Sequence, residues 1–229
     1  MAWEKENGRR NFLKVAALGA ASLATPFARG MYQAQRGGFQ SPETPERALE
    51  LLGEGNERYL AQKLVSFQED LDILKAHTEE RQEPFAAVLS CADSRVPVEL
   101  VFDQSIGHLF VVRVAGNIAT PDTIASLEYG AAVLGTKAIL VMGHTNCGAV
   151  KATLAAKAVP GQISGLYQYI YPATKGANGD AGTAIRQNAE LQASILRYTS
   201  PVLADLVKQK KLAIRAAVYD IGNGKVTML

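Results

Sequence analysis

A histidine and a cysteine lie close together in the stretch "GHTNCGAV", where two residues separate His144 from Cys147. The second cysteine of the chain is Cys91, in the stretch "SCADSRV". Two thiolates and one imidazole form a catalytic zinc set that leaves the fourth tetrahedral position to water. These ligands suit zinc better than magnesium or calcium. In an oxidising compartment the same two cysteines would form a disulfide by default, so the spacing alone leaves both alternatives open.

The elements that must position these residues are read from runs of apolar residues. Three short runs predict strands buried on both faces: Phe85–Ser90, Leu109–Ala115 and Ala138–Gly143. Apolar residues at helical spacing predict helices from Pro45, over Thr123–Gly135, over Thr183–Ser200 and over Pro201–Lys210, and a further helix is expected from about Cys147. The segments "IRAAVYDI" and "KVTML" predict a C-terminal hairpin. The alternation of strands and helices predicts an α/β fold with a mostly parallel β-sheet flanked by helices.

The first and third predicted strands end directly before the two cysteine-containing motifs. In an open parallel sheet, functional residues collect beyond the carboxyl ends of the strands. If these two strands are neighbours, Cys91, His144 and Cys147 converge at that edge. The pattern therefore predicts either a zinc site or a Cys91–Cys147 disulfide at one end of the sheet.

The two motifs together also resemble those of a known family. "CADSRV", followed some fifty residues later by "GHTNCGAV", closely resembles the β-class carbonic anhydrases, and the resemblance runs from about Pro45 to the C-terminus. It includes "GHLFVVRVAGN" and the closing "VYDIGNGKV". The resemblance implies zinc on Cys91, His144 and Cys147, and reversible hydration of CO2 to bicarbonate and a proton by zinc-bound hydroxide. It also implies assembly as a homodimer or homotetramer.

Three further residues have roles that the resemblance implies, and a fourth, Gly148, is singled out by its position after Cys147. Asp93 and Arg95 form a catalytic dyad, in which Asp93 orients the hydroxide and Arg95 holds the carboxylate in a charge-assisted pair. In some members of the family this aspartate becomes the fourth zinc ligand in a closed, inactive form. Gln104 matches a glutamine placed against the substrate. Gly148, at the start of the expected helix, is predicted to direct its N–H at the anion on the metal.

Two other functions remain as alternatives at this point. The same zinc fold can hydrolyse a CO2 analogue such as CS2 or COS. A non-catalytic exported α/β binding module would instead use Cys91 and Cys147 as a disulfide. A comparison of CO2 hydration with sulfide release distinguishes the first alternative from a carbonic anhydrase. Metal analysis with thiol titration distinguishes the second, because a disulfide-bonded module would hold no zinc and no free thiols.

The N-terminus has the features of an export signal. Arg9 and Arg10 precede a weakly apolar, Ala/Gly-rich run and then small residues, which resembles a twin-arginine (Tat) signal. We predict a signal peptide over residues 1–28, a linker over 29–45 and a single domain over 46–229. The protein is then expected in the periplasm, with no stable membrane span after cleavage. A Tat substrate folds before export, which allows a zinc site to form before the protein meets an oxidising compartment.

Charge limits the classes of partner. The whole chain carries a formal net charge of +2. Residues 1–29 hold five basic and two acidic residues, which leaves 19 basic and 20 acidic residues and a net charge of −1 for the rest. That balance gives no basic excess for binding nucleic acid or anionic membranes. The resemblance implies a small-molecule partner, CO2 or bicarbonate.

Overall fold

The computed structural model describes residues 41–66 and 82–229. The predicted signal peptide and most of the predicted linker lie outside these ranges. The first described helix is α3 (Pro45–Leu60), and the side chain of its N-cap residue Thr44 accepts a hydrogen bond from the Arg47 N–H. Proline at the first helical position and a threonine cap explain why the helix begins there. Ala48 and Leu52 on its apolar face are fully buried.

The centre of the fold is a five-stranded sheet with the order β2-β1-β3-β4-β5. The strands are β1 (Ala86–Ser90), β2 (Leu109–Arg113), β3 (Ala138–His144), β4 (Ala213–Tyr219) and β5 (Val226–Met228). The first four strands in this order run parallel, and β5 returns antiparallel to β4. Every residue of β1 and β3 is buried, as their uninterrupted apolar sequences predict. The same prediction is wrong for β2, whose apolar residues are only partly buried because it is the edge strand of the sheet. The predicted parallel sheet and terminal hairpin are both confirmed.

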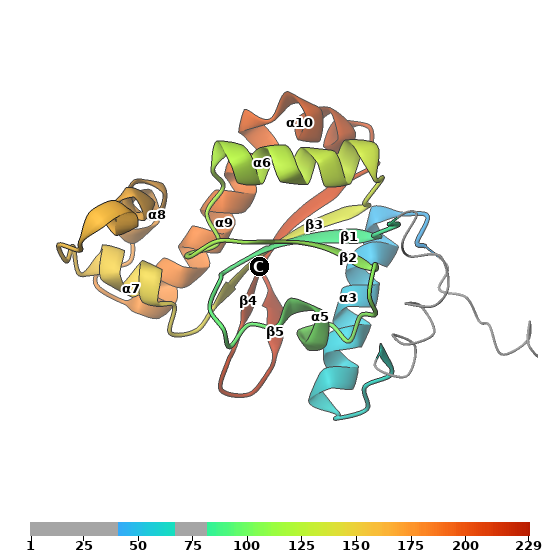
Figure 1. The fold of residues 1–229 in the computed structure, drawn as a ribbon, viewed down its shortest axis with the longest axis horizontal. Coiled ribbons are helices and arrows are strands. Elements are labelled where there is room, and N and C mark those ends of the chain that lie inside the picture. Colours follow the sequence, from blue (N-terminus) through green and yellow to red (C-terminus); the bar gives the residue numbers. More distant parts are fainter. Residues whose placement is uncertain (1–40, 67–81) are drawn as a thin grey trace, which may run out of the picture. The chain divides into compact units, whose positions relative to one another are not determined.

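Helices cover the two faces of the sheet, as Figure 1 shows. On one face, α3 and the short α5 (Val98–Val101) pack against Val88, Leu140 and Met142. The other face is covered by three helices: α6 (Pro121–Glu128), α9 (Ala181–Thr199) and α10 (Pro201–Lys208). Leu89, Ile139 and Val141 point to this second layer. Alternate residues of each central strand therefore feed two separate hydrophobic cores.

The helix predicted over Thr123–Gly135 is divided into two parts. After α6 the chain continues as a π-helix, η1 (Tyr129–Val133), and then stops at Gly135, whose φ is +79°. Glycine adopts this left-handed conformation without the penalty of a side chain, which is why the helix ends there.

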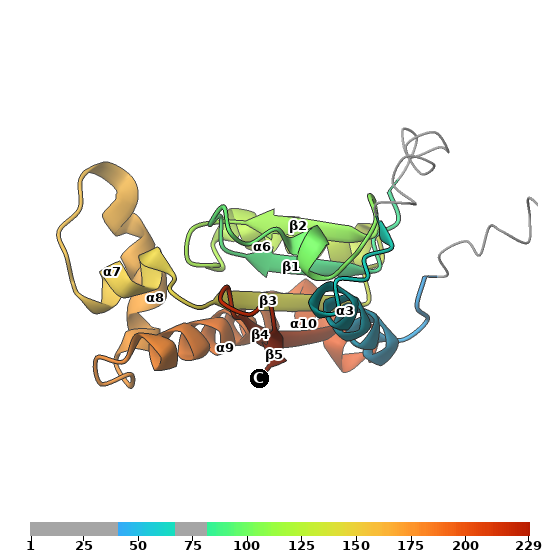
Figure 2. The same ribbon diagram turned by 90° about the horizontal axis from the view of Figure 1, so that it is seen from below.

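A smaller group of helices lies beyond the carboxyl ends of the strands (Figure 2). It consists of α7 (Gly148–Leu154), the 3-10 helix η2 (Gly161–Leu166) and α8 (Tyr167–Thr174). Ile118, Val150 and Ile170 form a third buried cluster there, together with both cysteines. The two predicted cysteine ligands therefore lie between the end of the sheet and this helical group. Within the described residues, no helix is both long and apolar enough to cross a membrane.

Candidate metal centre

Three potential metal ligands converge at the carboxyl end of the sheet. Cys91 directly follows β1, His144 is the last residue of β3, and Cys147 is the N-cap residue of α7. Their ligand atoms all lie within 4.8 Å of one another, and all three residues are buried. They meet because β1 and β3 are adjacent parallel strands, with Ser90 opposite Met142. Both cysteines are free, so the alternative of a Cys91–Cys147 disulfide is not supported.

The imidazole of His144 is oriented as a metal ligand. Its Nδ1 lies 2.9 Å from the carbonyl oxygen of Thr145, which can only accept, so Nδ1 carries the proton. Nε2 then presents a lone pair. That nitrogen is buried and has no hydrogen-bond partner among the described residues. A buried, unpaired acceptor next to two sulfurs is what a metal ion would satisfy.

The two thiols interact with each other. A hydrogen bond from the Cys147 thiol lowers the pKa of Cys91. The same interaction, together with burial, raises the pKa of Cys147 above its ordinary value. One thiolate is therefore favoured at this pair and a second is disfavoured. Both sulfurs can be anionic together only beside a cation, and two thiolates with one imidazole fit the preferences of zinc.

Backbone N–H groups support both sulfurs. The Gly116 N–H donates to Cys91 Sγ at 3.3 Å. Backbone hydrogen bonds from Val150 and Ala149, at the start of α7, lower the pKa of Cys147 and so favour its thiolate. Such outer contacts fix the position of metal ligands. The donor set and its surroundings therefore fit zinc at this site.

Asp93 and Arg95 form an ion pair beside the cluster. Arg95 donates to Asp93 through Nε at 3.0 Å, through Nη2 at 2.8 Å and through its backbone N–H at 3.0 Å. These hydrogen bonds hold the pKa of Asp93 well below its ordinary value. Asp93 Oδ2 also lies 3.8 Å from His144 Nε2. The carboxylate is thus ionised, oriented by arginine and next to a ligand atom.

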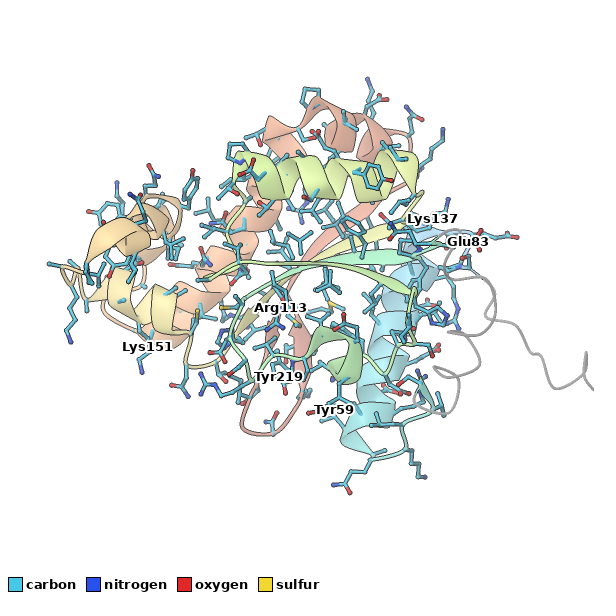
Figure 3. The ribbon with its side chains drawn as sticks, viewed as in Figure 1. Tyr59, Glu83, Arg113, Lys137, Lys151 and Tyr219 are labelled. Carbon is cyan, nitrogen blue, oxygen red and sulfur yellow. The ribbon has the colours of Figure 1, made fainter. Side chains whose placement is uncertain are left out.

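Arg113 is a residue of the site that the sequence motifs did not single out. Its Nε donates to the carbonyl oxygen of Cys91 at 3.0 Å, and its Nη2 donates to that of Asp93 at 2.5 Å. Arg113 ends β2, and Figure 3 labels it near the carboxyl ends of the strands. The sequence feature that could have identified Arg113 is its position as a charged residue at the end of the apolar run "LFVVR". The guanidinium fixes the backbone turn that carries both the ligand and the dyad.

The two predicted substrate-binding residues lie in different surroundings. Gln104 is buried after α5, and its Nε2 donates to the Phe102 carbonyl oxygen at 3.0 Å. The nearby helix α3 approaches it at Gly55, where an added Cβ would lie 3.1 Å from Gln104 Nε2. Gly148 is the first residue of α7, and an added Cβ there would meet no atom within 4 Å. Gly148 therefore borders open space next to Cys147, and the substrate roles of both residues stay predictions.

Known proteins are similar to this chain in sequence and in fold. The family model described as "Carbonic anhydrase" matches residues 86–226. The chain is 31% identical over 192 residues to carbonic anhydrase 2 of Mycobacterium tuberculosis, a match that covers 80% of this chain and 92% of the relative. It is 36% identical over 165 residues to a carbonic anhydrase of Pseudomonas aeruginosa, covering 65% of this chain and 74% of the relative.

Solved structures give the same answer for the fold. A Coccomyxa β-carbonic anhydrase in complex with acetazolamide superposes with a TM-score of 0.62 and 28% identity, covering 78% of this chain and 84% of that one. One of two tetrameric β-carbonic anhydrases from Sordaria macrospora gives a TM-score of 0.61 at 23% identity, covering 72% and 93%.

Proposed function

The chain belongs to the carbonic anhydrase family and is a zinc enzyme of the β class, and from this premise we propose how its own residues carry out the reversible hydration of CO2. The observation that carries the proposal is the convergence of Cys91, His144 and Cys147 beside the Asp93–Arg95 pair. Zinc, when bound, acts as a Lewis acid that makes water nucleophilic near neutral pH. The protein residues hold the metal, orient the nucleophile and keep the pocket dry.

Asp93 is proposed to orient the nucleophile. An ionised carboxylate only accepts hydrogen bonds, so it can take one from the attacking oxygen and direct a lone pair of that oxygen at CO2. Two N–H groups of the Arg95 guanidinium occupy its two oxygens, one each. This bidentate pair favours the ionised form and holds Asp93 in the open arrangement, away from the role of fourth zinc ligand.

CO2 has no leaving group, so the reaction needs no further acid to protonate one. It needs a site from which bulk water is excluded. Ile118, Val150 and Ile170 are buried around the cysteines and exclude bulk water from that side. A low-polarity surrounding strengthens the electrostatic contacts of the buried cysteines. Gly148, which borders open space, is proposed to leave room for the substrate and to offer its N–H to the developing anion.

The activity is tested by parallel assays on the zinc-loaded protein. We expect fast CO2 hydration in a stopped-flow pH-indicator assay and no comparable sulfide release from CS2 or COS. Asp93→Ala should lower the CO2 rate, whereas Glu54→Gln, an exposed change on α3, should not. Sulfide release that exceeds CO2 hydration would assign the protein to the alternative hydrolase chemistry.

We also propose that the protein is exported through the Tat pathway to the periplasm. The support is the twin arginine Arg9–Arg10 followed by the weakly apolar run. Replacing both arginines by lysine keeps the charge and removes the signal, so folded and active protein should remain in the cytoplasm. Unchanged periplasmic accumulation of that double variant would contradict the proposal.

A homodimer or homotetramer is the proposed assembly. The edge strand β2 has only partly buried apolar residues, and neighbouring apolar side chains are exposed: Ile106 by 42%, Tyr129 by 48% and Val133 by 65%. An edge strand with exposed apolar side chains is the kind of surface that a second copy could cover. Light scattering on the protein should give two or four chains per particle, and an active monomer would contradict this proposal.

A further inference from the structure

We propose that Asn188 and Gln192, two buried amide side chains of α9, are positioning residues for the zinc ligand Cys91. The proposal rests on the proposed function, because it assigns these residues to the metal site rather than to the fold alone. Both side chains are fully buried, at 0% exposure. Neither belongs to the motifs that identify the site, and their hydrogen bonds within the described residues go to Gly116, Ala119, Tyr169 and each other.

The two amides hold both ends of the segment Gly116–Ala119, which follows β2. Asn188 Nδ2 donates to the Gly116 carbonyl oxygen at 2.9 Å. Gln192 Oε1 accepts a hydrogen bond from the Ala119 N–H at 2.9 Å. In the same segment, the N–H of Gly116 is the group that donates to Cys91 Sγ. A chain of contacts therefore leads from α9 through Gly116 to the sulfur.

The amides also fix each other. Gln192 Nε2 donates to Asn188 Oδ1 at 3.0 Å and to the carbonyl oxygen of Tyr169, in α8, at 2.9 Å. The two residues stand four positions apart on one helical face, so their side chains meet. Their neighbours on that face, Ala189 and Ala193, are apolar and fully buried. Burying two primary amides in such a layer costs stability unless each is hydrogen-bonded, and here each is.

The segment turns sharply through two successive residues in the left-handed region of backbone conformation. Gly116 has φ +79° and the next residue, Asn117, has φ +46°. Glycine and asparagine are the residues that adopt this region most readily, so the sequence permits the turn, and the hydrogen bonds from α9 fix its orientation. An added Cβ on Gly116 would lie 2.7 Å from Ile170 Cδ1 and 3.3 Å from Ala149 Cβ. Gly116 therefore packs closely between Ile170 of α8 and Ala149, which lies two positions after Cys147.

This geometry gives the amides an effect on the metal. A backbone N–H fixed against a thiolate restricts the sulfur and draws electron density from it, which alters how strongly it donates to the metal. If Asn188 releases the Gly116 carbonyl, the Gly116 N–H loses its fixed direction and Cys91 loses its hydrogen bond. Outer contacts of this type typically change metal affinity by about 10- to 100-fold. The expected consequence is faster metal loss and a changed sulfur-to-metal bond.

The test compares three variants of the full-length protein. Asn188→Ala removes the bond to Gly116. Gln192→Met keeps the length and approximate volume of the side chain and removes the hydrogen bonds of Gln192, so it serves if the alanine variant does not fold. The matched control is Asn56→Ala. Asn56 is a buried amide on α3 that donates to the carbonyl oxygens of Val101 and Gly224 and accepts from the Val226 N–H, on the opposite face of the sheet.

Two readouts report on the metal and one on the fold. They are the rate of zinc transfer to a chelator, the sulfur-to-metal absorption band of the cobalt-substituted protein, and the unfolding midpoint of the metal-free protein. We expect Asn188→Ala and Gln192→Met to release zinc about 10- to 100-fold faster and to shift the cobalt band. Asn56→Ala should lower the unfolding midpoint and leave both metal readouts at the wild-type values.

Loss of stability in the α9 variants with unchanged zinc release and an unchanged cobalt band would overturn the inference. The network would then support the fold alone, as Asn56 does. A wild-type protein that takes up neither zinc nor cobalt would instead contradict the proposed function, so the two failures are distinguishable.

Discussion

Two aspartate–arginine pairs lie in different regions of the molecule and differ in what they connect. Asp93 and Arg95 are two residues apart beside the metal centre, and the Arg95 side chain is 52% exposed. Asp103 and Arg58 are 45 residues apart, and the Asp103 side chain is fully buried. The first pair joins neighbours on one turn of backbone. The second joins the end of α3 to the segment after α5.

The surroundings of the two carboxylates explain the difference. Asp103, with φ +44°, also accepts hydrogen bonds from the backbone N–H groups of Val65 and Ser66. It therefore joins three segments: the end of α3, residues 65–66 and the residues after α5. Asp93 takes its hydrogen bonds from Arg95 and lies beside His144 Nε2. An aspartate–arginine pair thus stabilises the fold at Asp103, whereas the pair at Asp93 is proposed to take part in the chemistry.

The largest expected effect is at the pair beside the metal. In Arg95→Ala the freed carboxylate is expected to bind the zinc, because a neighbouring cation favours its ionised form. CO2 hydration should fall by about 100-fold or more, while zinc content stays at one per chain and the unfolding midpoint hardly changes. Stopped-flow rates, metal analysis and thermal unfolding measure the three quantities.

The variant Asp93→Ala separates loss of the oriented nucleophile from binding of the carboxylate to the metal. It removes the acceptor and leaves the fourth metal position open to water or an added anion. The cobalt-substituted Asp93→Ala protein should respond to added anion, whereas the Arg95→Ala protein should not. Wild-type CO2 hydration in both variants would reduce the dyad to a loop ion pair, and the comparison with Asp103 would then fail.

The second prediction concerns the buried pair. Asp103→Asn removes the charge that Arg58, Val65 and Ser66 share, and weakening these charge-assisted hydrogen bonds is expected to cost about 2 kcal/mol of unfolding free energy. The CO2 hydration rate per folded, zinc-loaded molecule should stay at the wild-type value. Urea unfolding and the same stopped-flow assay test both parts. A variant with full stability and lost activity would reverse the roles assigned to the two regions.

The elements and the cluster followed from the sequence for physical reasons. Buried parallel strands must be apolar on both faces, which the runs at β1 and β3 show, and functional residues follow such strands at their carboxyl ends. Arg113 and Asn188 could not be identified in the same way. Their partners are backbone carbonyls brought close by the fold, and two amides four residues apart on α9 look like an ordinary helix in sequence.

The third prediction uses pH to sharpen the comparison. Burial alone would raise the pKa of Asp103, but the hydrogen bonds from Arg58, Ser66 and Val65 together lower it below the ordinary value. A lowered folded-state pKa stabilises the fold fully above the unfolded value of about 3.9, and this contribution disappears as the pH falls through the folded value. The stability difference between wild type and Asp103→Asn should therefore shrink when urea unfolding is repeated from about pH 7 to about pH 3. A difference independent of pH would show that the charge of Asp103 is not what stabilises the fold.

The smallest effect is expected at a third acid–arginine pair. Arg47 and Glu54 on α3 lie 2.6 Å apart, but both side chains are 46% exposed. Water and salt screen such a pair, so its contribution to stability is small. Glu54→Gln should leave the unfolding midpoint and the CO2 hydration rate at the wild-type values. A clear loss of stability would mean that exposure does not decide what these pairs contribute.

The central claim is that zinc is held by two thiolates and one imidazole from Cys91, His144 and Cys147. Zinc K-edge X-ray absorption on the purified, active protein tests it directly. We expect one zinc per chain with two sulfur ligands at about 2.3 Å and a nitrogen ligand at about 2.0–2.1 Å, and loss of both metal and activity in Cys147→Ala. Active protein that contains no zinc, that keeps full zinc in Cys147→Ala, or that has Cys91 and Cys147 joined as a disulfide would contradict the claim.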